Sequence, residues 1–177
     1  DDGQKRFLGE SGAFNGEDII EIICKQPATA RFISRHMYSF FVADEPPVPQ
    51  WPYQEPKDHS AIQMLEKVYF DSKYNITEML RTLFNSEFFK STDCHYEKIK
   101  SPVELVTGVL RTTKEFTSPK IEVPERNNQI TYMGQHLLNP PSVAGWAQGR
   151  SWITPALILE RGNVAFDYLF PDIVNFR

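Results

Sequence analysis

The stretch that decides the fold is residues 27–42, PATARFISRHMYSFFV. Its apolar side chains recur at three- and four-residue spacing, which is typical of an amphipathic α-helix. Pro27 stands at its start, where the missing backbone N–H of proline costs no hydrogen bond. We therefore predict a helix over this stretch, with Arg31 and Arg35 about one turn apart on its other face.

Helical patterns recur along the rest of the chain. Residues 17–26 begin with two acids, which favour a helix N-terminus, and residues 101–110 begin with Ser-Pro-Val-Glu, a capping box with proline at the first helical position. Further helices are predicted after caps near Asp58 or Ser60 and near Asn75 or Thr77, and over residues 86–90, 130–139 and 154–169. Strand patterns are almost absent, so the predicted fold class is all-α, an irregular multi-helix bundle of about seven helices with long proline-rich loops.

The length of 177 residues suits one domain with a small appendage. Residues 1–16 are punctuated by glycine and are expected to form an extended arm or a short hairpin, and residues 17–177 a single all-α domain. Within that domain, residues 44–58 hold five prolines and are predicted to be a wrapping loop. We expect Trp51 and Tyr53 to pin this loop through aromatic contacts.

Composition excludes several classes of protein. Apolar residues make up 41% and charged residues 24%, which is ordinary for a globular domain. The net charge of −4 argues against a nucleic-acid partner, since such proteins usually carry a basic surface. No apolar run approaches the roughly 20 residues of a transmembrane segment. The chain starts Asp-Asp-Gly, neither a signal peptide nor a Met start, so we expect a piece of a longer precursor.

A second informative stretch is residues 137–153, LLNPPSVAGWAQGRSWI. Its prolines and glycines predict a structured loop, and structured loops often carry function. Trp146 and Trp152, with Arg150 and Asn139, could form a platform for a sugar ring or another flat ligand. The alternative, which the adjacent prolines favour, is a loop that plugs the helix bundle with both tryptophans as anchors.

The pair Arg31 and Arg35 has two interpretations. Two guanidinium groups one turn apart can bind a carboxylate, sulfate or phosphate in bidentate fashion. They can equally form ion pairs with nearby acids such as Glu17, Asp18 or Glu21.

A third candidate is Arg161, which lies beside Glu160 and Asn163 in the last predicted helix. We expect Arg161 to reach back under the 137–153 loop and hydrogen-bond its free carbonyls. This would be a structural role rather than a catalytic one.

Motifs of catalysis and metal binding are missing from the sequence. No Gly-x-Ser-x-Gly, Walker or Rossmann pattern occurs, so no cofactor is predicted. No metal is predicted either, because the four histidines stand far apart and form no ligand spacing. Cys24 and Cys94 are expected to be buried thiols, or one disulfide if the protein is exported.

Several motifs together resemble one family. They stand in order at residues 7–20, 26–33, 100–106, 138–146 and 149–153, and Arg161 and Asn163 match a pattern near the family's end. The chain resembles the carboxy-terminal part of the bacterial DUF1800 family, a family of unknown function. The resemblance implies an exported or envelope-associated bacterial protein and carries over no catalytic residue. One departure is Gly162, where a bulkier aliphatic residue is more usual.

The leading functional hypothesis is a non-catalytic binding or assembly module of the periplasm, the cell envelope or the exterior. Its expected partner is another protein or the missing amino-terminal half of its own precursor. One alternative is a hydrolase-type enzyme acting on an extracellular polymer or ester, with the arginines and tryptophans above shaping the site. The other is a structural subunit of a large envelope or membrane-associated complex. The sequence does not decide whether the protein is an enzyme, and it identifies no substrate, partner or oligomeric state.

Overall fold

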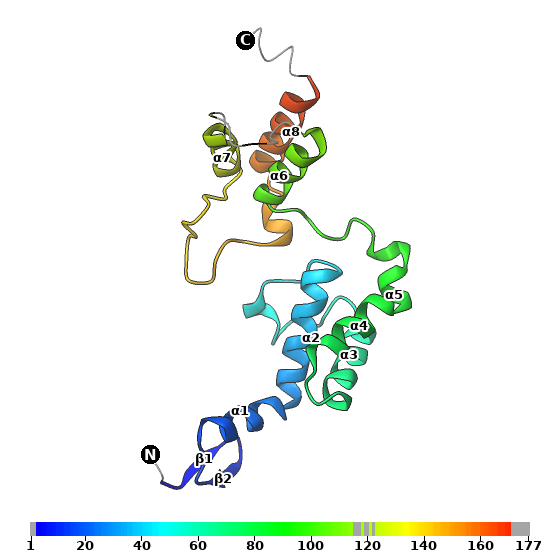
Figure 1. Ribbon diagram of the computed structural model, residues 1–177, viewed down its shortest axis with the longest axis vertical. Coiled ribbons are helices and arrows are strands. Elements are labelled where there is room, and N and C mark those ends of the chain that lie inside the picture. The colour runs from blue at the N-terminus through cyan, green and yellow to red at the C-terminus, as the bar shows by residue number, and fades with distance from the viewer. Residues whose placement is uncertain (1–2, 115–117, 119–120, 122, 171–177) are drawn as a thin grey trace. The chain divides into compact units, whose positions relative to one another are not determined.

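The chain divides into two compact units, Asp1–Glu97 (unit 1) and Lys98–Arg177 (unit 2). They are seen in a computed structural model that describes residues 3–114, 118, 121 and 123–170 (Figure 1). Each unit has its own helices and its own buried side chains, and each is described by itself. The expectation of a single domain over residues 17–177 stays a prediction.

The all-α fold class is confirmed, with eight α-helices among the described residues against about seven predicted. Unit 1 contains α1 Gly16–Cys24, α2 Pro27–Phe41, α3 His59–Asp71, α4 Ile76–Asn85 and α5 Glu87–Lys90. Unit 2 contains α6 Pro102–Thr113, α7 Val123–Tyr132 and α8 Pro155–Leu169. Three short 3₁₀ turns join them, η1 Val48–Gln50, η2 Thr92–Cys94 and η3 Gly149–Trp152.

The N-terminal residues form the short hairpin rather than the extended arm. Strands β1 Lys5–Phe7 and β2 Glu10–Gly12 pair antiparallel. Leu8 and Gly9 between them have φ angles of 47° and 90°. Two successive positive φ angles are what a two-residue hairpin turn requires, because such a turn matches the twist of the flanking strands.

Local side-chain caps explain where two of the helices begin. Before α1, the Asn15 side chain accepts hydrogen bonds from the backbone N–H groups of Glu17 and Asp18, at 2.8 and 3.0 Å. Asp18 accepts in return from the Asn15 N–H at 2.9 Å. Before α6, Ser101 and Glu104 form the predicted capping box. Each cap satisfies backbone donors that a helix start would otherwise leave unpaired.

The predicted helix over residues 130–139 is wrong in its bounds, because α7 ends at Tyr132. Gly134 has a φ angle of +90°, and the Gln135 N–H turns back to the Ile130 carbonyl at 3.1 Å. A glycine in this conformation ends a helix. Leu137 nevertheless packs against the core of unit 2. Its apolar spacing from Ile130 and Met133 is therefore that of a helix, although α7 has already ended.

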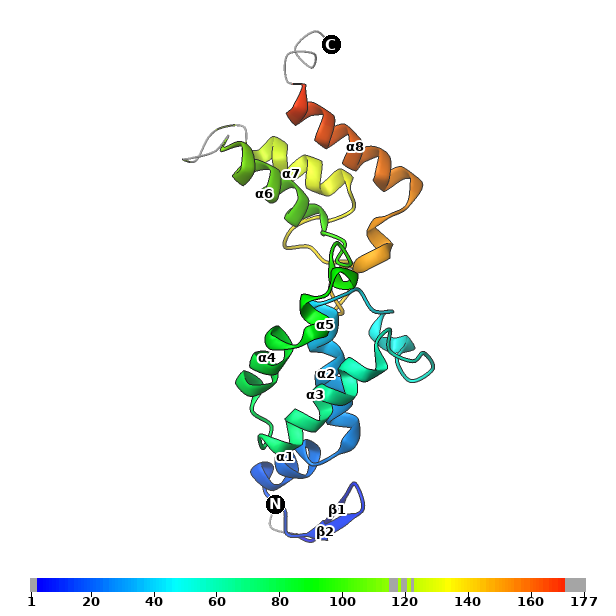
Figure 2. The same cartoon turned by 90° about the vertical axis from the view of Figure 1, so that its right-hand side faces the viewer.

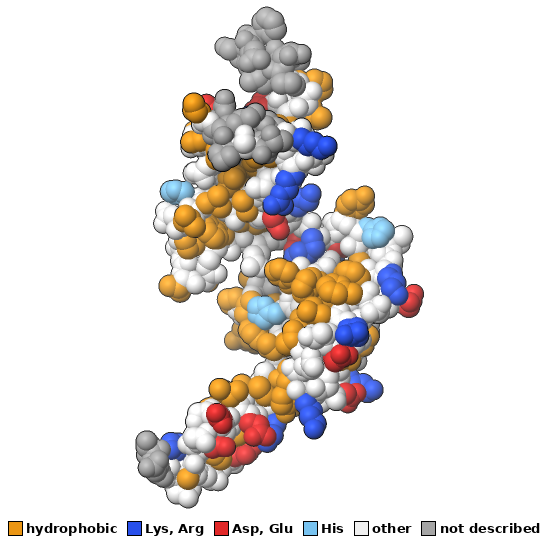
Figure 3. All heavy atoms as spheres, in the orientation of Figure 1, with side chains coloured by type: hydrophobic (Ala, Val, Ile, Leu, Met, Phe, Trp, Pro, Cys, Tyr) orange, Lys and Arg blue, Asp and Glu red, His pale blue; other side chains and the backbone are white. Residues whose placement is uncertain are grey.

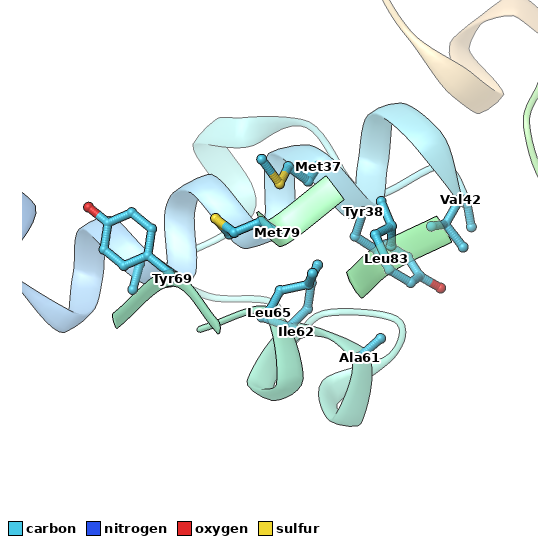
Figure 4. Close-up of a cluster of buried hydrophobic side chains, with 11 residues drawn as sticks. Met37, Tyr38, Val42, Ala61, Ile62, Leu65, Tyr69, Met79 and Leu83 are labelled. Carbon is cyan, nitrogen blue, oxygen red and sulfur yellow. The ribbon is translucent and has the colours of Figure 1, made fainter. Parts of the chain in front are cut away.

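The core of unit 1 forms where α2, α3 and α4 pack together (Figures 1 and 4). Eleven buried side chains make one cluster, and the ones that exclude solvent most completely include Ile62 and Leu65 of α3 and Met79 and Leu83 of α4. Burying a side chain of this size stabilises a fold by about 1.5–3 kcal/mol. Unit 1 therefore has the core expected of a stable helical domain.

The core of unit 2 is much smaller. Helices α6, α7 and α8 all contact one another (Figure 2), but among the described residues their buried cluster holds only Val106, Ile130, Met133 and Val164. Small cores leave little net stability after the entropy of ordering the chain.

Both cysteines lie in unit 1 and are free, half-buried thiols. The Cys94 thiol donates to the Phe88 carbonyl at 2.9 Å, and the Tyr69 hydroxyl donates to the Cys24 carbonyl at 3.0 Å. Desolvation raises the pKa of Tyr69 to about 12, which keeps this hydroxyl protonated as a donor. Within the described residues, no helix has the length and apolar character that crossing a membrane requires.

Candidate functional site

Arg35 is the most completely bonded side chain of unit 1. Its Nε donates to Glu45 Oε2 at 2.7 Å, and its Nη1 and Nη2 donate to the carbonyls of Gln54 and Glu55 at 2.8 and 3.2 Å. The Arg35 and Glu45 side chains are only 3% and 0% exposed. A buried charge is tolerated when it is paired and hydrogen-bonded, so this guanidinium is occupied by its own chain.

These bonds fasten the proline-rich loop to α2. Glu45 Oε1 accepts from the Lys57 N–H at 2.8 Å, and Trp51 Nε1 donates to the Pro46 carbonyl at 2.7 Å. The Trp51 ring also lies 4.8 Å from the Arg35 guanidinium carbon. The expectation that Trp51 pins the loop by aromatic contacts therefore agrees with its place, whereas Tyr53 is 88% exposed and does not pin it.

Trp51 closes a small aromatic cluster on α2. Its ring centroid lies 4.6 Å from that of His36 and 5.6 Å from that of Phe32. Phe32 and His36 are themselves 4.4 Å apart in an edge-to-face arrangement. Desolvation by these rings lowers the pKa of His36, because burial disfavours the charged imidazolium.

Arg31 pairs with Glu55 Oε2 at 2.7 Å on the exposed surface. The acids that the sequence suggested as partners, at residues 17–21, have other roles: Asp18 caps α1, and Glu21 pairs with Lys25 at 2.9 Å. The arginines form ion pairs, but with acids of the proline-rich loop. No local periodicity relates those loop acids to α2, so the sequence could not identify them.

The 137–153 loop belongs to unit 2. Trp152 is buried in η3, and a Cβ atom added at Gly134 would lie 3.7 Å from its ring. Trp146 is half-buried, and its Nε1 is enclosed with no hydrogen-bond partner among the described residues. Asn139 and Arg150 are exposed, and the Asn139 side-chain amide lies 3.3 Å from His136 Nδ1. Trp152 is thus buried, whereas Trp146 is only half-buried, and the plug interpretation stays a prediction.

Arg161 of α8 has a different partner from the expected one. Its Nη2 donates to the Lys100 carbonyl at 2.6 Å, just before α6, and not to the carbonyls of the 137–153 loop. Its Nη1 is buried without a hydrogen-bond partner among the described residues. Desolvation lowers the pKa of Arg161. The side chain therefore joins the start of α6 to α8.

The seven predicted site residues fall in both units. Arg31 and Arg35 lie in unit 1, and Asn139, Trp146, Arg150, Trp152 and Arg161 lie in unit 2. That they form a binding site stays a prediction.

Sequence reasoning missed the outer face of α8. Only Val164 of this 15-residue helix is buried, whereas Leu159 and Leu169 are 64% and 72% exposed, and Ile158 and Phe166 are also exposed. A helix that is apolar on all sides is normally covered on all sides. That all-round pattern is visible in the sequence, but it does not show which side of the helix stays uncovered. Apolar side chains also reach the surface of unit 1 (Figure 3).

Beside this face, a groove of about 750 Å³ runs between α7 and α8. Gln129 and Tyr132 line it from α7, and Leu159, Gly162 and Phe166 line it from α8. Gly162 leaves open space, since a Cβ atom added there would meet nothing within 4 Å. The Gln129 Oε1 atom is enclosed and accepts no hydrogen bond from any described residue. The arrangement suits an elongated apolar ligand with polar groups.

The parts of the chain that the structure describes contain no cluster of metal-binding side chains. No three His, Cys, Asp or Glu side chains gather there closely enough to hold an ion.

Comparison with known proteins identifies the family to which this chain belongs. Neither the curated proteins nor the solved structures contain a match to this chain. A family model described as "Protein of unknown function (DUF1800)" matches residues 1–173, which is nearly the whole chain. The matched span includes all of unit 1, unit 2 up to residue 173, and every predicted site residue. The chain therefore belongs to the DUF1800 family.

Proposed function

We propose that this chain is a non-catalytic binding and assembly module of an exported or envelope-associated bacterial protein. The observation that carries the proposal is the outer face of α8, where apolar side chains are exposed and a single residue is buried. Export and envelope association rest on the family resemblance alone.

The energetics of unit 2 support assembly. In the part of unit 2 that the structure describes, the buried cluster has four members, while four large apolar side chains of α8 remain exposed: Ile158, Leu159, Phe166 and Leu169. Covering apolar surface contributes about 25 cal/mol per Å². A partner on α8 would therefore supply several kcal/mol, in the same range as the net stability of a small domain.

The chemistry of unit 1 supports a scaffold role. Arg35 would be the natural anchor for an anionic ligand, but Glu45 and three backbone carbonyls already take up its donors. Displacing those partners would leave a carboxylate buried without its counter-charge, which costs several kcal/mol. Arg35 therefore has the structural role of holding the proline-rich loop in shape.

Native mass spectrometry of the untagged protein, purified from its source, tests the proposal. We expect a species heavier than the polypeptide that carries this chain, containing a second polypeptide. The double variant Leu159→Asp, Leu169→Asp should lose the second polypeptide, because charge on the outer face of α8 opposes its burial.

The control is Phe40→Ser, which removes a similarly exposed apolar side chain from α2 of unit 1. It should keep the second polypeptide. A clean monomer, or an assembly that survives the α8 variant, would overturn the proposal. Alanine variants of Trp152 are less informative, because Trp152 is buried and its loss would destabilise unit 2 directly.

A further inference from the structure

We infer that the groove between α7 and α8 binds a helix of a partner protein that carries apolar residues together with Lys or Arg. The inference rests on the proposed assembly function and names the class of partner. The groove itself, about 750 Å³ with one wall from each helix, is the first observation.

The second observation is the spacing along α8. Leu159, Gly162, Phe166 and Leu169 follow one another at intervals of three, four and three residues. This is the spacing of a helix–helix seam, in which side chains of one helix enter holes on the other. Val164, the buried residue of α8, also lines the groove. The first three residues of this seam line the groove, and Leu169 continues the spacing beyond it.

Gly162 has a particular place in this seam. It stands between the large side chains of Leu159 and Phe166, and the space over its Cα is open. A hole of this kind receives an apolar side chain from a packed helix. Unit 2 already holds three mutually packed helices, and a helix added in the α7–α8 groove would complete a four-helix arrangement.

The charge of the groove selects the partner. Glu160 and Asp167, seven residues apart and so on the same side of α8, both line the groove and are half-buried. Neither forms an ion pair with another described residue. Yet residues 98–177 hold nine Lys and Arg against seven Asp and Glu. An acidic groove in a unit of net positive charge favours Lys or Arg on the bound helix.

The enclosed Gln129 oxygen adds to this complementarity. It accepts no hydrogen bond from the described residues, and a Lys or Arg side chain has donors and no acceptor. The same acidic lining repels phosphate, so nucleic acid and phosphorylated peptides are disfavoured.

The probe for a test is a fluorescent helical peptide of leucine and lysine, about 18 residues long so that its helix is stable enough to bind. The matched peptide replaces every lysine by glutamate. Fluorescence anisotropy with the full chain should show binding of the lysine peptide and none of the glutamate peptide.

Two pairs of variants locate the site. Asp167→Lys should weaken binding at least about tenfold, whereas Glu125→Lys, the same charge change at an exposed position outside the groove, should weaken it less than about threefold. Gly162→Leu fills the open space and should also weaken binding about tenfold or more, whereas Gly162→Ala should leave it nearly unchanged. Leucine and alanine both suit a helix interior, so neither substitution threatens folding.

Equal binding to the Asp167→Lys and Glu125→Lys variants would overturn the inference, because it would show general attraction to the acidic chain. A dimer of this chain that Gly162→Leu disrupts would overturn it in favour of a second copy in the groove. If native mass spectrometry finds a second polypeptide but the lysine peptide does not bind, this inference fails and the assembly function stands. If the peptide binds as expected but the native protein is monomeric, the groove stands and the assembly function fails.

Discussion

The ion pair of Arg35 and Glu45 determines the path of the proline-rich loop. One guanidinium replaces the hydrogen bonds that three loop carbonyls would otherwise make with water, at Trp51, Gln54 and Glu55. Proline-rich segments cannot satisfy themselves by regular backbone pairing. The loop is therefore ordered by a side chain of α2 rather than by secondary structure.

Arg35→Met should destabilise unit 1 by about 3–5 kcal/mol, because it leaves Glu45 buried without its counter-charge. Urea unfolding, together with amide hydrogen exchange of residues 44–58, measures the loss. Arg31→Met is the control: its pair with Glu55 is exposed, so the change should stay below about 1 kcal/mol. Similar losses in the two variants would contradict the role given to Arg35.

The double variant Arg35→Met, Glu45→Leu separates charge from hydrogen bonding. It removes the unpaired carboxylate, so stability should partly return. Full recovery is not expected, because the loop carbonyls lose their donor, and each buried acceptor left unpaired costs about 1–3 kcal/mol.

His36 makes the attachment of the loop sensitive to acid. Its pKa is lowered in the folded state by the rings of Phe32 and Trp51, so the open loop binds the proton more readily than the closed one. The stability that this contact contributes is fully present when the pH lies above about 6.5, the ordinary pKa of histidine. It is lost as the pH falls from that value through the lowered pKa of the folded state.

An NMR titration of the His36 ring should therefore give a midpoint below about 6.5. Hydrogen exchange of residues 44–58 should accelerate over the same pH interval. The variant His36→Phe keeps an aromatic ring and should remove this pH dependence. A midpoint at or above the ordinary value would refute the sensitivity.

At the scale of single elements, the sequence was most informative where a local signal begins a helix. Pro27, Ser101 and Thr154 each stand at a helix start, as predicted. Such signals depend on neighbours within three residues, so they survive whatever the rest of the chain does. The end of α7 was mispredicted because Leu137 is apolar for a reason of tertiary packing.

Two glycines of unit 2 should respond in opposite ways to substitution by alanine. Gly162→Ala should stabilise the unit by up to about 1 kcal/mol, since the helix gains propensity and the new Cβ meets nothing. Gly134→Ala should destabilise it, because its φ angle of +90° is strained for a residue with a Cβ atom.

Hydrogen exchange of α7 and α8 in the two variants measures these changes within unit 2. The exposed substitution Ser151→Ala, at a side chain with no hydrogen bond to another described residue, is the neutral reference. If Gly134→Ala matched this reference, the helix end described for α7 would be incorrect.

At the scale of the whole molecule, the sequence led to the fold class and the family but not to the two units. No run of Gly, Pro or Ser marks the boundary after Glu97, so the usual sign of a linker was missing. Charge differs between the halves: residues 1–97 hold ten Lys and Arg against sixteen Asp and Glu. The α7–α8 groove could not be derived either, because it depends on how two helices pack and not on any one of them.

The unequal cores predict the order in which the units unfold. Among the described residues, the buried core cluster of unit 1 has eleven members and that of unit 2 has four, so α6, α7 and α8 should exchange amide hydrogens faster than α2 and α3. Hydrogen exchange of the full chain, analysed by peptide mass spectrometry, measures both sets at once. Equal protection in the two sets would instead indicate one cooperative domain over residues 17–177.

Adding the lysine peptide extends this prediction to the groove. A ligand that binds only the folded unit stabilises it by about 2.7 kcal/mol at a hundred times its Kd. Exchange of α7 and α8 should then slow about a hundredfold, and that of α2 and α3 should not change. Protection of α2 and α3 by the peptide would place its binding site on unit 1, where the net charge is more negative, and not in the groove.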